Sequence, residues 1–165
     1  MSNYEPMSAP PPEGQGVQPK GEPPPSIKTA VTIVWVSLAL SVLGTILTFV
    51  FIDDIVDTAM KGQPATVSED TVRTGVIVGT IFALLVFGAL YVLLALFLRK
   101  GAGWARIVLT IIAVIGVVFG IFGLFGEQTA VQTILGIIQI ALSAALLYFL
   151  WRPDSTEFLK PQPVG

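Results

Sequence analysis

Three aspartates at helical spacing are the side chains of this sequence best suited to chemistry. Asp53, Asp54 and Asp57 form an Asp-Asp-x-x-Asp motif directly after a long apolar run. On a helix this spacing brings carboxylates to one face, where they can hold Mg2+ against a diphosphate. The only possible acidic partner for such a site is Glu69 with Asp70. The alternatives are loose cation binding and a solvated acidic loop that helps to set orientation, and we favour the loop.

The aspartate motif resembles the one that prenyl-transferring enzymes use, which gives a remote alternative: a magnesium-dependent prenyl-diphosphate enzyme. The resemblance implies a second acidic motif across a cavity and basic residues for the diphosphate. It also implies a site that faces the cytoplasm, as such enzymes usually do. The chain has no histidine and no cysteine, so it lacks the commonest general base, the commonest zinc ligand and the usual partners of an activated nucleophile. We therefore expect a non-enzymatic protein with no catalytic residue, cofactor, metal or nucleic-acid partner.

Gln139 is the most polar side chain within the long apolar runs, and Ser143 follows it one helical turn later. A glutamine in a membrane can bridge two helices through a hydrogen bond, so we expect Gln139 and Ser143 to serve helix packing. The second hypothesis is a small oligomeric channel or carrier, which requires a continuous polar path. Besides Gln139 and Ser143, only Thr45 and Thr80 could line such a path. No charged residue interrupts an apolar run, which argues against a proton relay or a voltage sensor.

Four long apolar runs carry these residues. The chain of 165 residues is 53% hydrophobic and 12% charged, with a mean hydropathy of +0.81, far above what a soluble domain needs. Each run is long enough, at about 1.5 Å per residue, to cross the hydrocarbon core of a bilayer. The sequence therefore predicts an all-α polytopic membrane protein, with four transmembrane helices in an antiparallel bundle over residues 26–152. The spans are expected at residues 29–52, 75–98, 107–125 and 130–151.

A short basic connector between the second and third runs fixes the expected orientation. Its cations must lie outside the hydrocarbon, because a central Arg or Lys costs about 2.5 to 3.5 kcal/mol. Folding back and forth from this connector puts seven cationic residues on one side and only Lys61 and Arg73 on the other. The positive-inside rule then predicts a multi-pass plasma membrane protein with both termini in the cytoplasm. The residues expected to anchor the cytoplasmic interface are Trp35, Arg99, Lys100, Trp104, Arg106, Trp151 and Arg152.

Small residues recur at spacings of three and four in the apolar runs and predict close helix packing. The stripe in the third run is expected to mark the tightest helix crossing, either within the chain or between copies of it. The first run has a weakly polar face that should look toward other helices, made of Ser37, Ser41, Gly44, Thr45 and Thr48. The packing residues of the second and third runs are Gly75, Gly79, Ala83, Gly116, Gly120 and Gly123.

Cap signals define where the helices should begin. We expect Ser26 to cap the first helix, which should continue past its apolar run to about residue 60, where Gly62 and Pro64 end it. Thr66 with Glu69, and Thr129 with Gln132, have the spacing of capping boxes. These boxes predict that the second and fourth helices begin at these positions.

Both ends of the chain are polar. Residues 1–25 hold eight of the twelve prolines and are expected to form a disordered tail. This tail either stays solvated, which we favour, or docks into an SH3-like or WW-like groove of a cytoplasmic partner. Residues 153–165 are expected to form a loose polar tail. Neither a cleaved signal peptide nor a lipid anchor is expected.

A short motif at the start of the third run carries one family resemblance. Residues 101–106 read Gly-x-Gly-Trp-Ala-Arg, the head is proline-rich, and residues 151–155 read Trp-Arg-Pro-Asp-Ser. This layout resembles small four-span membrane proteins of high-GC Gram-positive bacteria, and the resemblance implies an architecture and a bacterial plasma membrane. We therefore expect a structural or accessory component of a membrane assembly. Its expected partners are the lipid bilayer and either copies of itself or other membrane proteins.

Overall fold

The computed structural model describes residues 21–126 and 128–160, and within these ranges it contains helices and no strands. Four of the helices are long and apolar enough to cross a membrane: α1, α3, α4 and α5. The prediction of an all-α chain with four candidate spans is therefore confirmed. The elements are α1 (Pro25–Val50), α2 (Ile52–Met60), α3 (Glu69–Arg99), α4 (Gly103–Leu124), α5 (Ala130–Leu150) and α6 (Pro153–Leu159).

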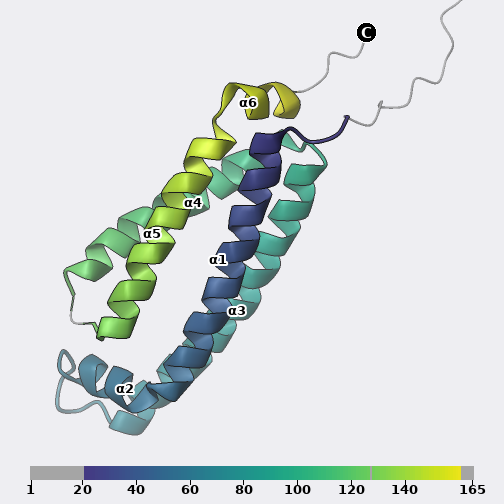
Figure 1. The fold of residues 1–165 in the computed structure, drawn as a ribbon. Coiled ribbons are helices and arrows are strands. Elements are labelled where there is room, and N and C mark those ends of the chain that lie inside the picture. The colour runs from purple at the N-terminus through teal and green to yellow at the C-terminus, as the bar shows by residue number, and fades with distance from the viewer. Residues whose placement is uncertain (1–20, 127, 161–165) are drawn as a thin grey trace, which may run out of the picture.

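The four long helices run antiparallel to their neighbours in sequence (Figure 1). α1 packs along both α3 and α5, and α4 packs along α5, whereas α3 and α4 contact each other less. We call the end where α1 begins, where α3 leads into α4 and where α6 lies the proximal end. The opposite end, with α2 and the connection from α4 to α5, is the distal end. The pair of α4 and α5 diverges from the pair of α1 and α3 toward the distal end (Figure 1).

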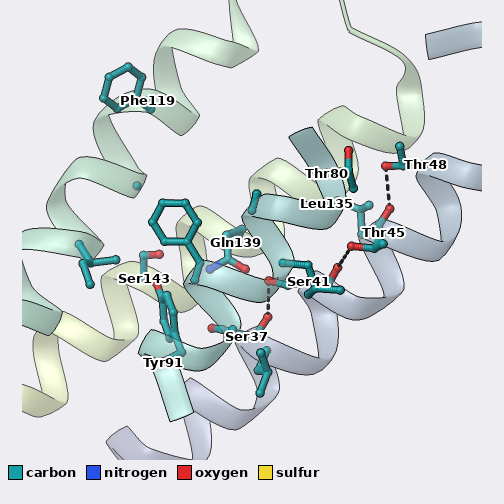
Figure 2. A pocket seen from close by; sticks show the side chains of 18 of the residues that line it. Ser37, Ser41, Thr45, Thr48, Thr80, Tyr91, Phe119, Leu135, Gln139 and Ser143 are labelled. Atoms are coloured by element: carbon teal, nitrogen blue, oxygen red, sulfur yellow. Dashed lines mark hydrogen bonds between the residues drawn. The ribbon is translucent and has the colours of Figure 1, made fainter. Parts of the chain in front are cut away.

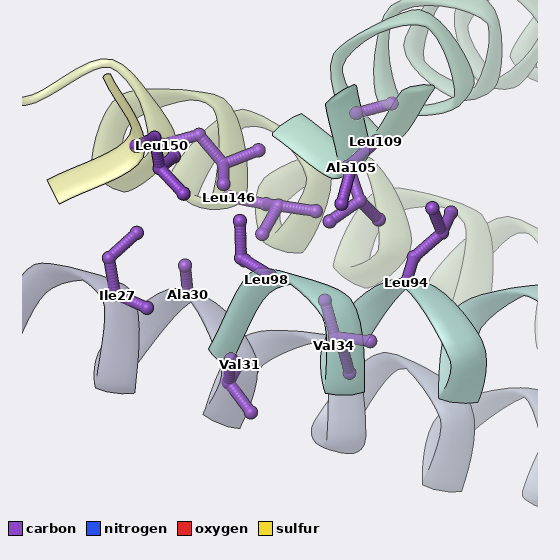
Figure 3. Close-up of a cluster of buried hydrophobic side chains, with 13 residues drawn as sticks. Ile27, Ala30, Val31, Val34, Leu94, Leu98, Ala105, Leu109, Leu146 and Leu150 are labelled. Carbon is purple, nitrogen blue, oxygen red and sulfur yellow. The ribbon is translucent and has the colours of Figure 1, made fainter. Parts of the chain in front are cut away.

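The buried apolar core occupies the proximal half of the bundle. It is built from the first turns of α1 and α4 and the last turns of α3 and α5, with one side chain from α6 (Figure 3). Because lipid tails are as apolar as these side chains, close packing rather than exclusion from water holds them together. The core residues are Ile27, Ala30, Val31, Val34, Leu94, Ala95, Leu98, Ala105, Leu109, Ala113, Leu146, Leu150 and Leu159.

The first apolar run differs from its expected form at both ends. α1 begins at Pro25, after Pro24 at the N-cap position, and no side chain caps it. Ser26 is therefore inside the helix, and the expectation that it caps the helix is wrong. The chain turns at Phe51, with φ −107° and ψ 30°, so the amphipathic extension to Met60 is a separate helix, α2. Val56 of α2 is fully buried, which fixes this short helix beside the start of α3.

The two expected capping boxes have different outcomes. α3 begins at Glu69, and Ser68 rather than Thr66 is its N-cap, because the Thr71 N–H donates to Ser68 Oγ at 3.3 Å. α5 has the capping box that the sequence predicts. The Gln132 N–H donates to Thr129 Oγ1 at 3.3 Å, and the Thr129 N–H donates to Gln132 Oε1 at 3.1 Å.

The segment after α5 folds back onto the proximal end. Residues 153–159 form α6, so the expectation of a loose tail is wrong for this stretch. Leu159 is 4% exposed, and the chain passes so closely there that a Cβ added to Gly103 would lie 2.9 Å from the Leu159 carbonyl oxygen. The expectations for residues 1–20 and 161–165 fall outside the described residues.

Candidate functional site

A cavity of about 760 Å3 lies between the four long helices, on the distal side of the core. Its residues come from consecutive turns of all four helices, so the divergence of the two helix pairs creates it. Figure 2 shows the weakly polar face of α1 and the amide of Gln139 on its walls. The polar lining residues are Ser37, Ser41, Thr45, Thr48, Thr80, Tyr91, Gln132, Gln139 and Ser143.

A layer of apolar side chains closes the proximal end of the cavity. Each long helix contributes one residue to this layer, and none of the four is more than 2% exposed. The layer is Val34, Leu94, Leu109 and Leu146. Each of these residues lies three positions, or about one turn, from the innermost lining residue of its helix, respectively Ser37, Tyr91, Ile112 and Ser143. The cavity is therefore blind toward the proximal end, and we call this layer the floor.

The cavity opens to the side between α3 and α4. These two helices make less contact than the other neighbouring pairs of long helices. Phe87 of α3 and Phe119 of α4 both line the cavity, yet they are 52% and 72% exposed. Gly116 also lines it, and a Cβ added there would meet no atom within 4 Å. The two phenylalanines thus form the rim of an opening that faces the surroundings of the bundle.

Hydroxyl groups of α1 present hydrogen-bond acceptors to the cavity. Ser41 Oγ donates to the carbonyl oxygen of Ser37 at 2.9 Å, and Thr45 Oγ1 donates to that of Ser41 at 3.0 Å. Thr48 Oγ1 donates to the carbonyl oxygen of Gly44 at 2.9 Å (Figure 2). A serine or threonine hydroxyl has one proton, and these protons are committed within the helix. The oxygen lone pairs remain as acceptors.

The Gln139 amide lines the same cavity from α5. The sequence predicts a hydrogen bond between Gln139 and a neighbouring helix, but within residues 21–126 and 128–160 its side chain has no hydrogen-bond partner. Gln132, by contrast, is held by the capping box. The cavity therefore contains one amide with both a free donor and a free acceptor.

The small residues predicted for packing fall into three environments. Gly120 lies against α5, since an added Cβ would be 2.8 Å from Ile140 Cγ1, and Gly123 is equally close to Gln128 Nε2. Ser143, which is 6% exposed, lines the cavity together with Ala83 and Gly116. Neither Gly75 nor Gly79 lines the cavity, and a Cβ at either position would meet nothing within 4 Å. The packing role of these last two glycines stays a prediction.

The aspartate motif lies on α2 at the distal end. Asp53 pairs with Arg73 of α3, and Arg73 Nη2 also lies 3.5 Å from Glu69 Oε1. In the part of the chain that the structure describes, no three acidic side chains gather as a group that could hold a metal ion. The observed role of Asp53 is to tie α2 to the first turns of α3.

The expected interface anchors at the proximal end contact one another. The Arg106 guanidinium lies 4.5 Å from the centre of the Trp151 ring, and its Nη1 donates to Thr156 Oγ1 at 3.1 Å. Trp151 Nε1 donates to Thr110 Oγ1 at 3.1 Å. Arg106 Nε is buried and has no hydrogen-bond partner among the described residues. Arg106 thus joins α4 to the end of α5 and to α6.

The remaining anchors are more exposed, and their contact with a membrane surface stays a prediction. The Trp104 ring lies 5.0 Å from that of Phe97, Lys100 Nζ lies 5.8 Å from the Phe97 ring centre, and Arg99 ends α3. Arg152 Nε is 3.8 Å from Asp154 Oδ1. Trp35 lies farther from the proximal end than the other anchors. It is about 15 Å along α1 from Pro25, next to the floor residue Val34.

These features define a polytopic α-helical membrane protein with a blind cavity between its spans. No family model, curated protein or solved structure matches the chain. The resemblance to four-span proteins of high-GC Gram-positive bacteria therefore stays a prediction. The sequence identifies most of the polar lining residues individually, but it does not predict the cavity. The only sequence signal for the cavity is the shared spacing of small and weakly polar residues on three helices.

Proposed function

We propose that this chain is a non-enzymatic accessory component of an assembly in a bacterial plasma membrane. It works by packing the outer face of α3 against a transmembrane helix of another copy or another membrane protein. The proline-rich tail adds a cytoplasmic contact, and both termini lie in the cytoplasm. The absence of histidine and cysteine from the sequence supports a role without catalysis.

The observation that supports this proposal is the difference between filled and open glycines. Added Cβ atoms at Gly44 and Gly88 would lie 3.7 Å and 3.5 Å from side chains of neighbouring helices, so the chain itself covers these positions. Gly75 and Gly79 are exposed, with open space beside them, and Phe82 nearby is 66% exposed. Glycines four residues apart let a second helix approach closely, and the resulting van der Waals packing is one of the sources of helix association in lipid.

Substitution of Gly79 tests this contact. Gly79→Leu places a bulky side chain on the α3 face, so the crosslinked species formed by the full chain in membranes should disappear. Gly116→Leu is the matched control, because it makes the same change at another open glycine that faces the cavity. Crosslinked species that persist in Gly79→Leu would contradict packing on α3. The mass of the adduct separates a second copy from another protein.

Deletion of residues 2–25 separates the helix contact from the tail. Crosslinked species that survive the deletion are formed by the helices, as we propose. If the deletion removes them while Gly79→Leu leaves them intact, the tail alone recruits the partner. The proposed contact on α3 would then be wrong.

The proposed orientation can be tested cleanly because the chain has no cysteine of its own. Three exposed positions, Gly21, Gln63 and Lys160, can each be replaced by a single cysteine. A membrane-impermeant maleimide should label Gln63→Cys on intact cells, and the other two only after permeabilisation. The seven-to-two distribution of cations supports this result. Labelling of Lys160→Cys on intact cells would reverse the orientation.

A further inference from the structure

The cavity has the size and the walls of a ligand site. Its volume of about 760 Å3 falls within the roughly 300 to 1,000 Å3 typical of pockets that bind small molecules. Every described residue that lines it is uncharged. The walls from α1 and α5 carry hydroxyl and amide groups, whereas those from α3 and α4 are mainly hydrocarbon and aromatic. A molecule that satisfies both sides is amphiphilic and bears no net charge.

The hydrogen-bond pattern narrows the polar part of this molecule. The hydroxyls of Ser41, Thr45 and Thr48 have given their protons to backbone carbonyls, so they can only accept. A phosphate diester or an ester carbonyl also only accepts, and it leaves these oxygens without partners. A hydroxyl headgroup can donate to them. Gln139 supplies a complementary donor and acceptor. Further donors are the lining hydroxyls whose protons are not committed to a hydrogen bond among the described residues, those of Ser37, Thr80, Tyr91 and Ser143.

The shape of the cavity indicates the route of entry. The floor closes it toward the proximal end, with Leu94 and Leu109 fully buried. The rim formed by Phe87 and Phe119 is exposed on the side, between α3 and α4. An acyl chain can leave through this side opening and remain among the lipid chains while its headgroup stays inside.

We infer that the cavity binds an uncharged single-chain lipid with a hydroxyl headgroup, of the monoacylglycerol class. Its hydroxyls contact the acceptor stripe of α1 and the Gln139 amide, and its acyl chain lies along α3 and α4 and passes between Phe87 and Phe119. An ionised headgroup is excluded because the cavity offers it no opposite charge. This inference goes beyond the packing of α3 proposed above and does not depend on it.

Two photoactivatable lipids with the same diazirine-bearing acyl chain test the inference. One is a monoacylglycerol and the other is a lysophosphatidate, and the full chain is reconstituted in phosphatidylcholine vesicles with each. The monoacylglycerol should label the protein about tenfold more, and the labelled peptides should come from the segments that line the cavity. Unlabelled monoacylglycerol should compete. Equal labelling by the two lipids, or labelled peptides from outside the cavity, would overturn the assignment.

Matched variants locate the binding within the protein. Gly116→Leu fills the cavity and should lower monoacylglycerol labelling about tenfold, whereas Gly79→Leu, on the outer face of α3, should leave it unchanged. Gln139→Leu keeps the side-chain size and should reduce the preference for the hydroxyl headgroup. If Gly116→Leu fails to fold, Gln139→Leu decides the question. Equal labelling of the two glycine variants refutes the lipid site but not the proposed assembly, because that assembly depends on Gly79.

Discussion

Replacing Ser155 by alanine should release α6 from the proximal end of the bundle. Ser155 is fully buried, and its Oγ donates to Ser26 Oγ at 2.7 Å and lies 2.8 Å from the Phe149 carbonyl oxygen. Ser26 is only 3% exposed, so water does not readily replace the lost hydroxyl. A buried polar group left without its partner costs about 1 to 3 kcal/mol. At 1.4 kcal/mol per factor of ten, the equilibrium for opening α6 should rise about 5- to 150-fold.

A single cysteine reports this opening. Leu159 is 4% exposed and lies at the end of α6, so the thiol of Leu159→Cys reacts with a maleimide only when α6 opens. The labelling rate is compared with and without Ser155→Ala, because the shared Leu159→Cys change then cancels. Glu157→Ala, at an exposed position of the same helix, is the control and should leave the rate unchanged. A rate change of less than about twofold in Ser155→Ala would show that the buried hydroxyl does not hold α6.

Three further predictions follow from particular contacts. The Ser26 hydroxyl lowers the pKa of Asp154 below its ordinary value of 3.8. The contribution of this carboxylate to α6 docking should therefore be complete above that pH and should fade as the pH falls through the lowered pKa. A spin label at Lys160→Cys should then become more mobile, and Asp154→Asn should remove the pH dependence. Leu109→Ala should lower the unfolding free energy in detergent by about 2 to 5 kcal/mol, because Leu109 is fully buried in the floor. Thr129→Ala removes the N-cap of α5 and should cost about 0.5 to 2 kcal/mol in the same assay.

The four long helices could be predicted from the sequence because a bilayer imposes a simple requirement. A run of about 20 apolar residues must be a helix, since every backbone polar group in lipid has to be satisfied within the segment. The start of a helix can also be predicted where the residues that cap it are close in sequence, as in the capping box of Thr129 and Gln132. α6 was missed because its stability comes from a contact across the whole chain. Ser155 and Ser26 are 129 positions apart, and nothing in residues 153–159 alone reveals it.

The cavity could not be predicted because a small residue permits two opposite outcomes. Gly116 and Gly120 lie one turn apart on α4 in the same stripe. An added Cβ at Gly120 would lie 2.8 Å from Ile140, whereas one at Gly116 would meet nothing within 4 Å. The spacing predicts that helices can approach, but the relative tilt of two helices decides where they do. The helix-packing role of Gln139 stays a prediction for the same reason, since an amide that lines a cavity and an amide that bridges two crossing helices have the same sequence signature.

The cavity can persist because the solvent around the helices is lipid rather than water. In water an apolar hollow of this size favours collapse, but in a bilayer the hydrophobic effect does not drive helices together. The lining atoms still lose dispersion contacts that an occupant would restore. Filling the space with protein should therefore stabilise the empty bundle by about 0.5 to 2 kcal/mol, which Gly116→Leu tests in thermal unfolding without added lipid. Gly136→Leu is the control, because an added Cβ there also meets nothing within 4 Å and Gly136 does not line the cavity. It gains the same helix propensity, so the difference between the two variants isolates the filled cavity. If Gly116→Leu is no more stable than Gly136→Leu, the empty space costs the protein nothing, and the argument that an occupant stabilises it fails.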